Sequence, residues 1–370
     1  MLKLSCTLLC LLCGAVVNAQ YTLRIVVNDV ATKKLDDIYV AGSFNNWNMH
    51  DEKYKLKPFG TTRRAIILKD MAAGDYEFIF SRGSKDKVET TAKGEQVANH
   101  RISLKDDASI DFNIPGWKDD YPDKPKPNTA TAQVKLMDSA FVIPQLNRKR
   151  SIWIYLPKGY NTSKKTYPVI YMQDGQNLFN ENTAMQGEWG IDECLDTLMT
   201  KYNKECIVVG IASAVETRAR EFNPYEEGKR YAEFLATTLK PYIDKKYRTQ
   251  KEPVHTFLAG SNLGAVISLY TLIKYPNVFG GAGMFSPAFS IVQPLYEEVA
   301  KTTWRPYRPR FYFFAGDKDR DNTVPDMDKM IKTIESVGSY YTHRIMSPIA
   351  RQNEQAWRKD FPGFYAFIMQ

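Results

Sequence analysis

The stretch over residues 257–264 constrains this chain more than any other part of the sequence. It reads Phe-Leu-Ala-Gly-Ser-Asn-Leu-Gly and runs directly into the apolar segment 265–270. An apolar strand that turns through glycines straight into a helix brings its backbone into close contact, and Gly260 and Gly264 remove the side chains that would collide there. The sequence therefore predicts a sharp strand-turn-helix unit with Asn262 at its centre.

The central residue of this turn decides what chemistry it can perform. Turns of the pattern G-x-S-x-G present a serine nucleophile, but the central position here is Asn262. A carboxamide has no hydroxyl or thiol that a general base could activate for acyl transfer. Ser261 occupies the preceding position, from which a side chain leaves the turn in another direction. We interpret Ser261 as a small residue of the turn, and a nucleophilic Ser261 is the less favoured alternative.

The first residues of the chain predict export. Lys3 is followed by an apolar run that ends in Val-Asn-Ala, which predicts a signal peptide over residues 1–19 and cleavage before Gln20. We therefore expect an exported protein, periplasmic or extracellular. The apolar run is too short and wrongly flanked for a transmembrane helix, so we expect no membrane span.

The cysteines concern the redox compartment of the protein, and the distribution of charge concerns its binding partners. Removal of the signal peptide leaves Cys194 and Cys206, which could form a disulfide in an oxidising compartment or remain two small buried thiols. The net charge of +8 is spread along the chain, and its densest run, residues 148–150, is not interleaved with aromatic residues. We therefore expect no nucleic-acid partner.

Residues 20–115 predict a small all-β sandwich, because short apolar runs alternate there with turn residues and show no helical period. The predicted strands are 23–27, 37–42, 64–68, 76–80, 101–104 and 109–114. The passages 40–47 and 74–84 resemble starch- and glycogen-binding-like sandwich modules, which stack sugars on exposed tryptophans. Lys85 stands where relatives often carry one of these tryptophans, and Trp47 commonly packs as structure. A structural or docking module is therefore favoured over sugar binding.

The composition changes twice after this segment. Residues 116–132 predict a semi-extended linker, because three prolines stand among Asp, Lys and Thr with few apolar residues. From 133 to 370, strands alternate with amphipathic helices, which predicts an α/β domain with a mostly parallel sheet covered on both faces. The predicted strands are 150–155, 168–172, 206–211, 255–259, 280–285, 310–315 and 341–346. The predicted helices are 191–201, 229–245, 263–275, 325–336 and 353–361.

This second domain resembles the putative-esterase family of α/β-hydrolases over its whole length. The family includes enterochelin, feruloyl and acetylxylan esterases, S-formylglutathione hydrolase and the mycolyltransferases. The resemblance implies an α/β-hydrolase fold that acts on carboxylic esters without a cofactor. It is carried by residues 171–179, 188–192, 208–211, 218–222, 239–244, 275–280 and 353–357.

The resemblance also implies where the site lies. The nucleophile position is Asn262, the acid position is Asp319 and the histidine position is Gln352, so two of the three triad members are substituted. The backbone amides of Leu263 and Gly175 are implied as the oxyanion hole. The candidates for the ligand cleft, by family position, are Asp174, Glu188, Trp189, Arg218 and Glu221.

No histidine is placed to replace the missing base. His50 and His100 lie in the first domain. His255 opens the strand that leads to the turn, roughly 20 Å of extended chain away from its apex. His343 lies within the last strand, about 10 Å short of the site edge. Hydrolysis by the family mechanism should therefore be effectively absent.

The sequence predicts an exported two-domain protein whose esterase-like domain binds or scaffolds through its old substrate cleft. An acylated glycan or a siderophore-like small molecule is the expected ligand. The alternative is an active carboxylic ester hydrolase, feruloyl, acetylxylan or enterochelin esterase-like, with an altered site; a purely structural partner in a glycan-handling assembly is a third. We expect no metal site, because the acidic positions 317, 319, 321 and 326 lack the glycine and distant glutamate of an EF-hand.

Overall fold

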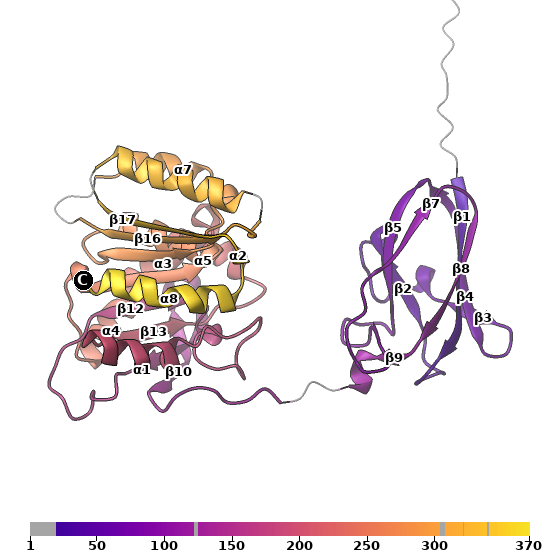
Figure 1. Ribbon diagram of the computed structural model, residues 1–370, viewed down its shortest axis with the longest axis horizontal. Helices are drawn as coiled ribbons and strands as arrows, with labels where there is room; N and C mark the ends of the chain where they lie inside the picture. The colour runs from indigo at the N-terminus through magenta and orange to yellow at the C-terminus, as the bar shows by residue number, and fades with distance from the viewer. Residues whose placement is uncertain (1–19, 122–124, 304–307, 321, 339) are drawn as a thin grey trace, which may run out of the picture. The chain divides into compact units, whose positions relative to one another are not determined.

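The computed structural model describes residues 20–121, 125–303, 308–320, 322–338 and 340–370. The chain forms two compact units that divide between Lys124 and Pro125, an all-β unit and an α/β unit (Figure 1). The predicted signal peptide, residues 1–19, lies outside the described residues. Within these residues, none of the helices has the length and apolar character needed to cross a membrane.

The first unit is a β-sandwich whose two larger sheets share one apolar core. One sheet has the strand order β3-β4-β1-β8 and the other β2-β5-β7, while β6 pairs with β9. Each of the six predicted strands overlaps one of these. The strands are β1 (Gln20–Val30), β2 (Tyr39–Gly42), β3 (Lys57–Phe59), β4 (Arg63–Ala72), β5 (Gly74–Ser81), β6 (Glu89–Thr90), β7 (His100–Leu104), β8 (Ala108–Ile114) and β9 (Gly116–Trp117).

The linker predicted over residues 116–132 is wrong at both ends. Trp117, in β9, is fully buried in the core of the first unit. At the other end, Thr129 Oγ1 donates to Glu188 Oε1 at 2.7 Å, and Thr131 N donates to Asp192 Oδ2 at 2.7 Å. Hydrogen bonds rather than apolar contacts hold this second stretch, so its polar composition gave no sign of it. We call residues 125–133 the strap.

The second unit is built on an eight-stranded sheet of order β10-β11-β13-β12-β14-β15-β16-β17. From β13 onward in this order, all strands run parallel to one another. At the other edge, β11 runs antiparallel to both of its neighbours, β13 and β10. The central strands are buried on both faces and are mostly apolar, with polar residues such as Gln173 and Ser261 at their carboxyl ends. The strands are β10 (Val134–Ile143), β11 (Arg148–Tyr155), β12 (Val169–Gln173), β13 (Ile207–Ile211), β14 (Thr256–Ser261), β15 (Gly281–Phe285), β16 (Arg310–Gly316) and β17 (Tyr341–Ser347).

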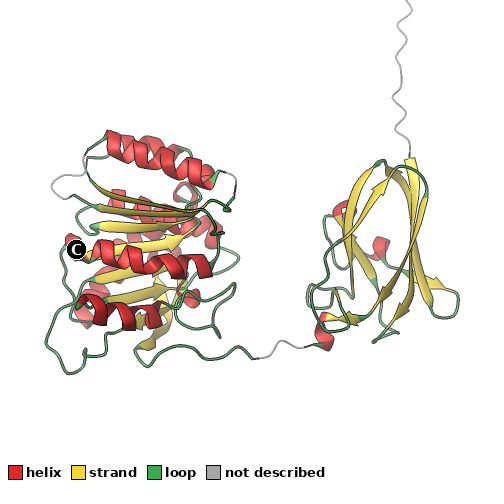
Figure 2. Ribbon diagram, viewed as in Figure 1, coloured by secondary structure: helices red, strands yellow, loops and turns green. Residues whose placement is uncertain are grey.

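Helices cover both faces of this sheet (Figure 2). Alternate residues of β12 show the two layers: Ile170 and Met172 pack in a core with α1 and α8, whereas Tyr171 packs in a core with α5. The expected α/β sheet covered on both faces is thus confirmed. The helices are α1 (Ile191–Tyr202), α2 (Arg218–Phe222), α3 (Lys229–Phe234), α4 (Lys240–Lys246), α5 (Leu263–Lys274), α6 (Pro294–Ala300), α7 (Thr323–Ser336) and α8 (Glu354–Ile368).

Two elements differ from the sequence prediction in a way that matters for the core. The helix predicted to end at Phe361 continues through Pro362 to Ile368. Its fully buried side chains Phe364 and Tyr365 lie beyond the proline, so packing outweighs the hydrogen bond that proline removes. Edge strand β10, which was not predicted, is largely exposed and does not alternate regularly between apolar and polar residues.

Candidate functional site

β14 and α5 meet in a sharp turn with Asn262 at its apex. Asn262 has φ of 54° and ψ of −118°, a backbone conformation that non-glycine residues rarely adopt. A Cβ on Gly260 would lie 2.6 Å from the backbone of Gly264, and one on Gly264 would lie 3.2 Å from Gln173 Cβ. Gly260 is therefore needed for the close approach of strand and helix, and Gly264 lets the start of α5 pack closely on Gln173 of β12.

The Asn262 carboxamide is bonded within the turn. Leu263 N donates to Asn262 Oδ1 at 2.7 Å. The amide after the apex residue is the group that forms half of an oxyanion hole in turns of this kind. Here that amide already has an acceptor. Gly175, predicted to supply the other half, is buried and packs so closely on β13 that a Cβ would lie 2.5 Å from Gly210 C.

A cleft of about 500 Å³ lies beside Asn262. Its walls are formed by segments that follow β12, β13, β14 and β16 and by the start of α8. The carboxyl ends of parallel strands are the edge at which open α/β sheets bind ligands. The lining residues are Asp174, Gln176, Asn177, Met185, Gln186, Ser213, Val215, Arg218, Ser261, Asn262, Arg320, Gln352, Glu354 and Trp357.

Asp174 and Arg218 form a bidentate ion pair in this cleft. Arg218 Nε and Nη2 donate to Asp174 Oδ1 and Oδ2 at 2.7 and 2.8 Å, and Ser213 Oγ donates to Asp174 Oδ1 at 2.6 Å. Burial works against the charged guanidinium, but the bonds to Asp174 outweigh it and raise the pKa of Arg218. Burial also raises the pKa of the neighbouring Glu354 carboxyl. The structure thus places two of the five predicted cleft candidates, Asp174 and Arg218, in a fixed polar wall.

Gln352 lines the cleft, and the loop of Asp319 is bonded to the segment that precedes it. Lys318 N donates to Ala350 O at 3.2 Å. Asp319 Oδ2 accepts from Gly316 N at 3.0 Å, whereas Asp319 Oδ1 is buried and has no hydrogen-bond partner among the described residues. Buried carboxylate oxygens nearly always have a partner. At the acid position, Asp319 Oδ1 is therefore a buried acceptor that receives no hydrogen bond, in a loop bonded to the segment that precedes Gln352.

Trp189 does not lie at the cleft rim, and the prediction is corrected for it. The side chain is 3% exposed. Its ring packs edge-on against Phe285, with 5.1 Å between the ring centroids. The Trp357 ring lies 5.2 Å away and is tilted by 37°. Burial of the large indole in this aromatic layer explains its position, and Trp357, rather than Trp189, borders the cleft.

Glu221 and Glu188 are also absent from the cleft lining. Glu221 is fully buried; its Oε1 accepts from Arg148 Nη1 at 2.7 Å and also pairs with Arg150. Glu188 accepts from Thr129 of the strap. Both carboxylates accept hydrogen bonds away from the cleft, so the rim prediction is corrected for both residues.

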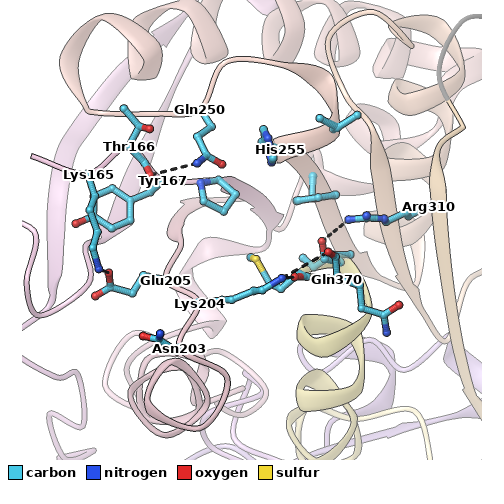
Figure 3. A pocket seen from close by; sticks show the side chains of 15 residues that line it. Lys165, Thr166, Tyr167, Asn203, Lys204, Glu205, Gln250, His255, Arg310 and Gln370 are labelled. Carbon is cyan, nitrogen blue, oxygen red and sulfur yellow. Dashed lines mark hydrogen bonds and ion pairs between the residues drawn. The ribbon is translucent and has the colours of Figure 1, made fainter.

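The four histidines lie away from the cleft. His255 lines a second pocket of about 470 Å³ at the opposite edge of the sheet (Figure 3). His343 stacks on Tyr312, with 5.2 Å between ring centroids. His50 and His100 belong to the first unit. Two cationic side chains of this second pocket are bonded to backbone carbonyls of the chain itself. Arg310 Nη1 donates to Ile368 O at 2.6 Å, and Lys204 Nζ donates to Met369 O.

Cys194 and Cys206 are free thiols, so the unpaired alternative is the one that the structure contains. Burial raises the pKa of Cys194 to about 11 and raises that of Cys206 well above its usual range. Neither thiol is activated for nucleophilic chemistry.

Several cleft residues were not singled out by the sequence. Gln186 and Arg320 come from irregular loops whose path no pattern predicted. Glu354 stands two residues after the histidine position, and that spacing was the one signal available for it. The acidic positions 317, 319 and 326 are not among the residues that line the cleft, and Asp321 lies outside the described residues.

The fold and this site define an α/β-hydrolase: an eight-stranded, mostly parallel sheet with a strained strand-turn-helix apex at its carboxyl edge. Residues 143–324 match the family described as "Putative esterase". This match confirms the resemblance of the second unit to the putative-esterase family that its sequence motifs predicted.

Three similar proteins show how far the likeness extends. The chain is 24% identical over 206 residues to the uncharacterized protein YbbA of Bacillus subtilis, covering 51% of this chain and 76% of that protein. It is 23% identical to an endo-1,4-beta-xylanase/feruloyl esterase of Xylanibacter ruminicola, covering 56% of this chain but 27% of the relative. The solved enterobactin esterase of Shigella flexneri is similar with a TM-score of 0.53 at 14% identity, covering 90% of this chain and 87% of that one. At this identity the structural likeness concerns the fold alone.

Proposed function

We propose that the second unit is a pseudo-esterase, which binds an acylated, oxygen-rich small molecule in the cleft and does not hydrolyse it. The observation that carries the proposal is the Asn262 carboxamide at the apex of the turn. It provides no nucleophile, and it occupies the Leu263 amide that would stabilise an oxyanion. Gln352, in the same cleft, cannot accept a proton near neutral pH as a histidine would.

The unpaired side chains of the cleft indicate the chemistry of the ligand. Gln186, Arg320 and Gln352 have no side-chain hydrogen bond to other described residues. Two carboxamides and a guanidinium offer several N–H donors, which suit a ligand with many oxygen acceptors. The relatives named as feruloyl and enterobactin esterases support an ester-bearing ligand, either an acylated glycan or a siderophore. Export of the protein is part of the same proposal.

Binding and turnover are measured on the same purified protein. Isothermal titration with feruloylated and acetylated xylo-oligosaccharides and with ferric enterobactin should give saturable binding to at least one of them. Chromatography of the same mixtures after prolonged incubation should show intact ester. Arg320→Ala should weaken binding about tenfold or more, because it removes a charge-assisted hydrogen bond.

Arg351→Ala is the matched control, since Arg351 is exposed and lines a different pocket. It should bind like the wild-type protein. Hydrolysis above the level of Asn262→Ala, or stoichiometric labelling of Ser261 by a fluorophosphonate, would refute the loss of catalysis and favour the active-hydrolase alternative. Absence of binding to all three ligand classes would refute the proposed ligand chemistry.

A further inference from the structure

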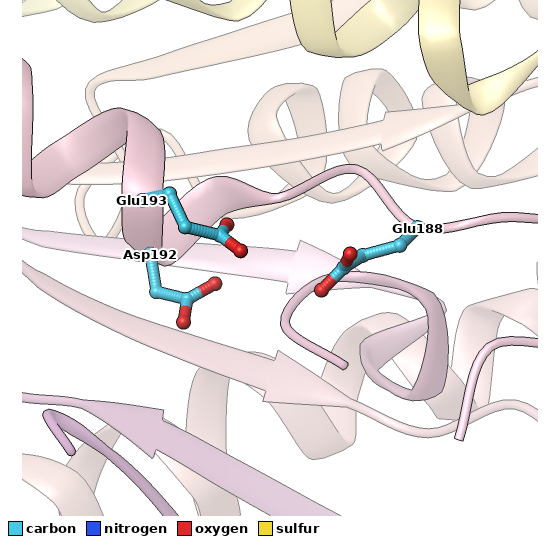
Figure 4. Close-up of side chains that lie close together, drawn as sticks. All are labelled: Glu188, Asp192 and Glu193. Atoms are coloured by element: carbon cyan, nitrogen blue, oxygen red, sulfur yellow. The ribbon is translucent and has the colours of Figure 1, made fainter. Parts of the chain in front are cut away.

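Three carboxylates gather where the strap meets the start of α1. Figure 4 shows Glu188, Asp192 and Glu193 with their carboxyl groups turned toward one another. One oxygen of each lies within 4.8 Å of the others. Glu188 lies in the same loop as Met185 and Gln186 of the cleft, two residues after Gln186, and none of the three carboxylates lines the cleft.

The cluster contains buried acceptors without donors. Asp192 is fully buried; its Oδ2 accepts from Thr131 N, but its Oδ1 has no hydrogen-bond partner among the described residues. Glu193 Oε2 also lacks a hydrogen-bond donor among the described residues. An isolated buried carboxylate oxygen costs considerable free energy. These oxygens therefore call for a cation or a proton.

The charges around the cluster also favour a bound cation or a proton. Arg358 approaches the cluster, but its nitrogens lie 3.9 Å from Glu188 Oε2 and from Glu193 Oε2, too far for hydrogen bonds. Three carboxylates and one guanidinium sum to a charge of −2 when all are ionised. Glu181 adds further negative charge near Glu188. Burial first, and then repulsion from Glu193, raise the pKa of Asp192.

The geometry fits one hard divalent cation. Oxygens that bind the same Ca²⁺ at about 2.3–2.6 Å are at most about 5 Å apart, and the three carboxylates meet this limit. Carboxylates supply mono- or bidentate oxygen ligands to Ca²⁺, and water molecules complete the coordination shell. Mg²⁺ demands a tighter octahedron and retains its water, so an irregular set of protein oxygens favours Ca²⁺.

We propose that Glu188, Asp192 and Glu193 form a calcium site that clamps the strap to the start of α1. Bound Ca²⁺ neutralises the cluster and fixes Glu188, and thereby the loop that carries Met185 and Gln186 into the cleft. The site is independent of whether the cleft binds esters.

The test uses full-length protein freed of metal with EDTA and dialysed at about pH 7.5. Titration with CaCl₂ should show one saturable site, with MgCl₂ binding at least about tenfold more weakly. Ca²⁺ should raise the melting temperature followed by circular dichroism, by mass action on the folded state. Asp192→Asn should lose at least tenfold in Ca²⁺ affinity, as should Glu193→Gln, whose partly exposed side chain makes it the safer variant for folding.

Asp317→Asn is the matched control, because Asp317 belongs to the other acidic group of the chain and is exposed. It should bind Ca²⁺ unchanged. The rival is a cluster that shares protons: its metal-free melting temperature would fall with rising pH and recover in Asp192→Asn, but Ca²⁺ would produce no heat of binding. That result, or loss of Ca²⁺ binding in Asp317→Asn and not in Glu193→Gln, would overturn the proposal.

Discussion

Restoring the two substituted triad positions tests whether the cleft still has the architecture of an esterase. We expect Asn262→Ser alone to remain inert, because no base is present to take the serine proton. Gln352→His alone should also be inert, since position 262 then has no nucleophile for the imidazole to activate. The double variant should hydrolyse aryl acetates, because Asn262 and Gln352 line the same cleft.

The structure supplies two reasons for expecting a gain. Replacing Asn262 removes the Oδ1 acceptor from Leu263 N and returns that amide to a substrate oxyanion. A histidine at position 352 offers a ring N–H to Asp319 Oδ1, which now has no partner among the described residues. A complete triad acts as a unit and contributes about 10⁶ in kcat, or about 8 kcal/mol. Recovery of half that free energy would make the double variant about 10³-fold faster than either single variant.

The assay is release of p-nitrophenol, with fluorophosphonate labelling as a count of reactive serines. Adding Asp319→Asn to the double variant should lower the rate about 10²-fold or more, because the imidazole loses the group that orients it. A double variant with wild-type circular dichroism and melting temperature that stays inert would refute this reasoning. So would single and double variants of equal activity.

Three further predictions concern stability and thiols. Glu221→Ala should destabilise the second unit by about 3 kcal/mol in urea unfolding, because it leaves Arg150, whose side chain is 10% exposed, without a carboxylate partner; a loss under 1 kcal/mol would contradict the buried network. Cys194 and Cys206 should both appear as free thiols in mass spectrometry of unreduced protein, and Cys206 should resist thiol reagents until the protein unfolds. Burial raises the pKa of Asp360 to about 6, so its contribution favours folding below its unfolded pKa and is lost as pH rises through about 6. Asp360→Asn should flatten that part of the stability curve measured by thermal melting, and an unchanged curve would exclude the assignment.

The fold was predictable because its signals are local and repetitive. Buried parallel strands are mostly apolar, and the turn around Asn262 needs Gly260 regardless of what the protein does. β10 escaped prediction because an edge strand is half exposed and carries no such pattern. The strap escaped because its hydrogen bonds to Glu188 and Asp192 depend on partners about 60 positions away in the chain.

The site was predictable only where a backbone motif carries the residue. Asn262 and Asp174 follow the ends of central strands, and the topology alone brings those ends together. Trp189 and Glu221 were misassigned because their residue types suit a ligand cleft as well as a core. Only the surroundings, an aromatic layer for Trp189 and two arginines for Glu221, decide between these positions.

The aromatic layer also gives the cleft an optical reporter. Trp357 borders the cleft, donates Nε1–H to Ser286 Oγ at 2.9 Å and lies 5.2 Å from the Trp189 ring at an angle of 37°. Two indoles this close and fixed in orientation couple their electronic transitions, so they should produce an intense near-ultraviolet circular dichroism signal. Anything that enters the cleft against Trp357 changes the polarity around one of the two rings. The protein thus contains its own spectroscopic probe of cleft occupancy, which needs no label and no turnover.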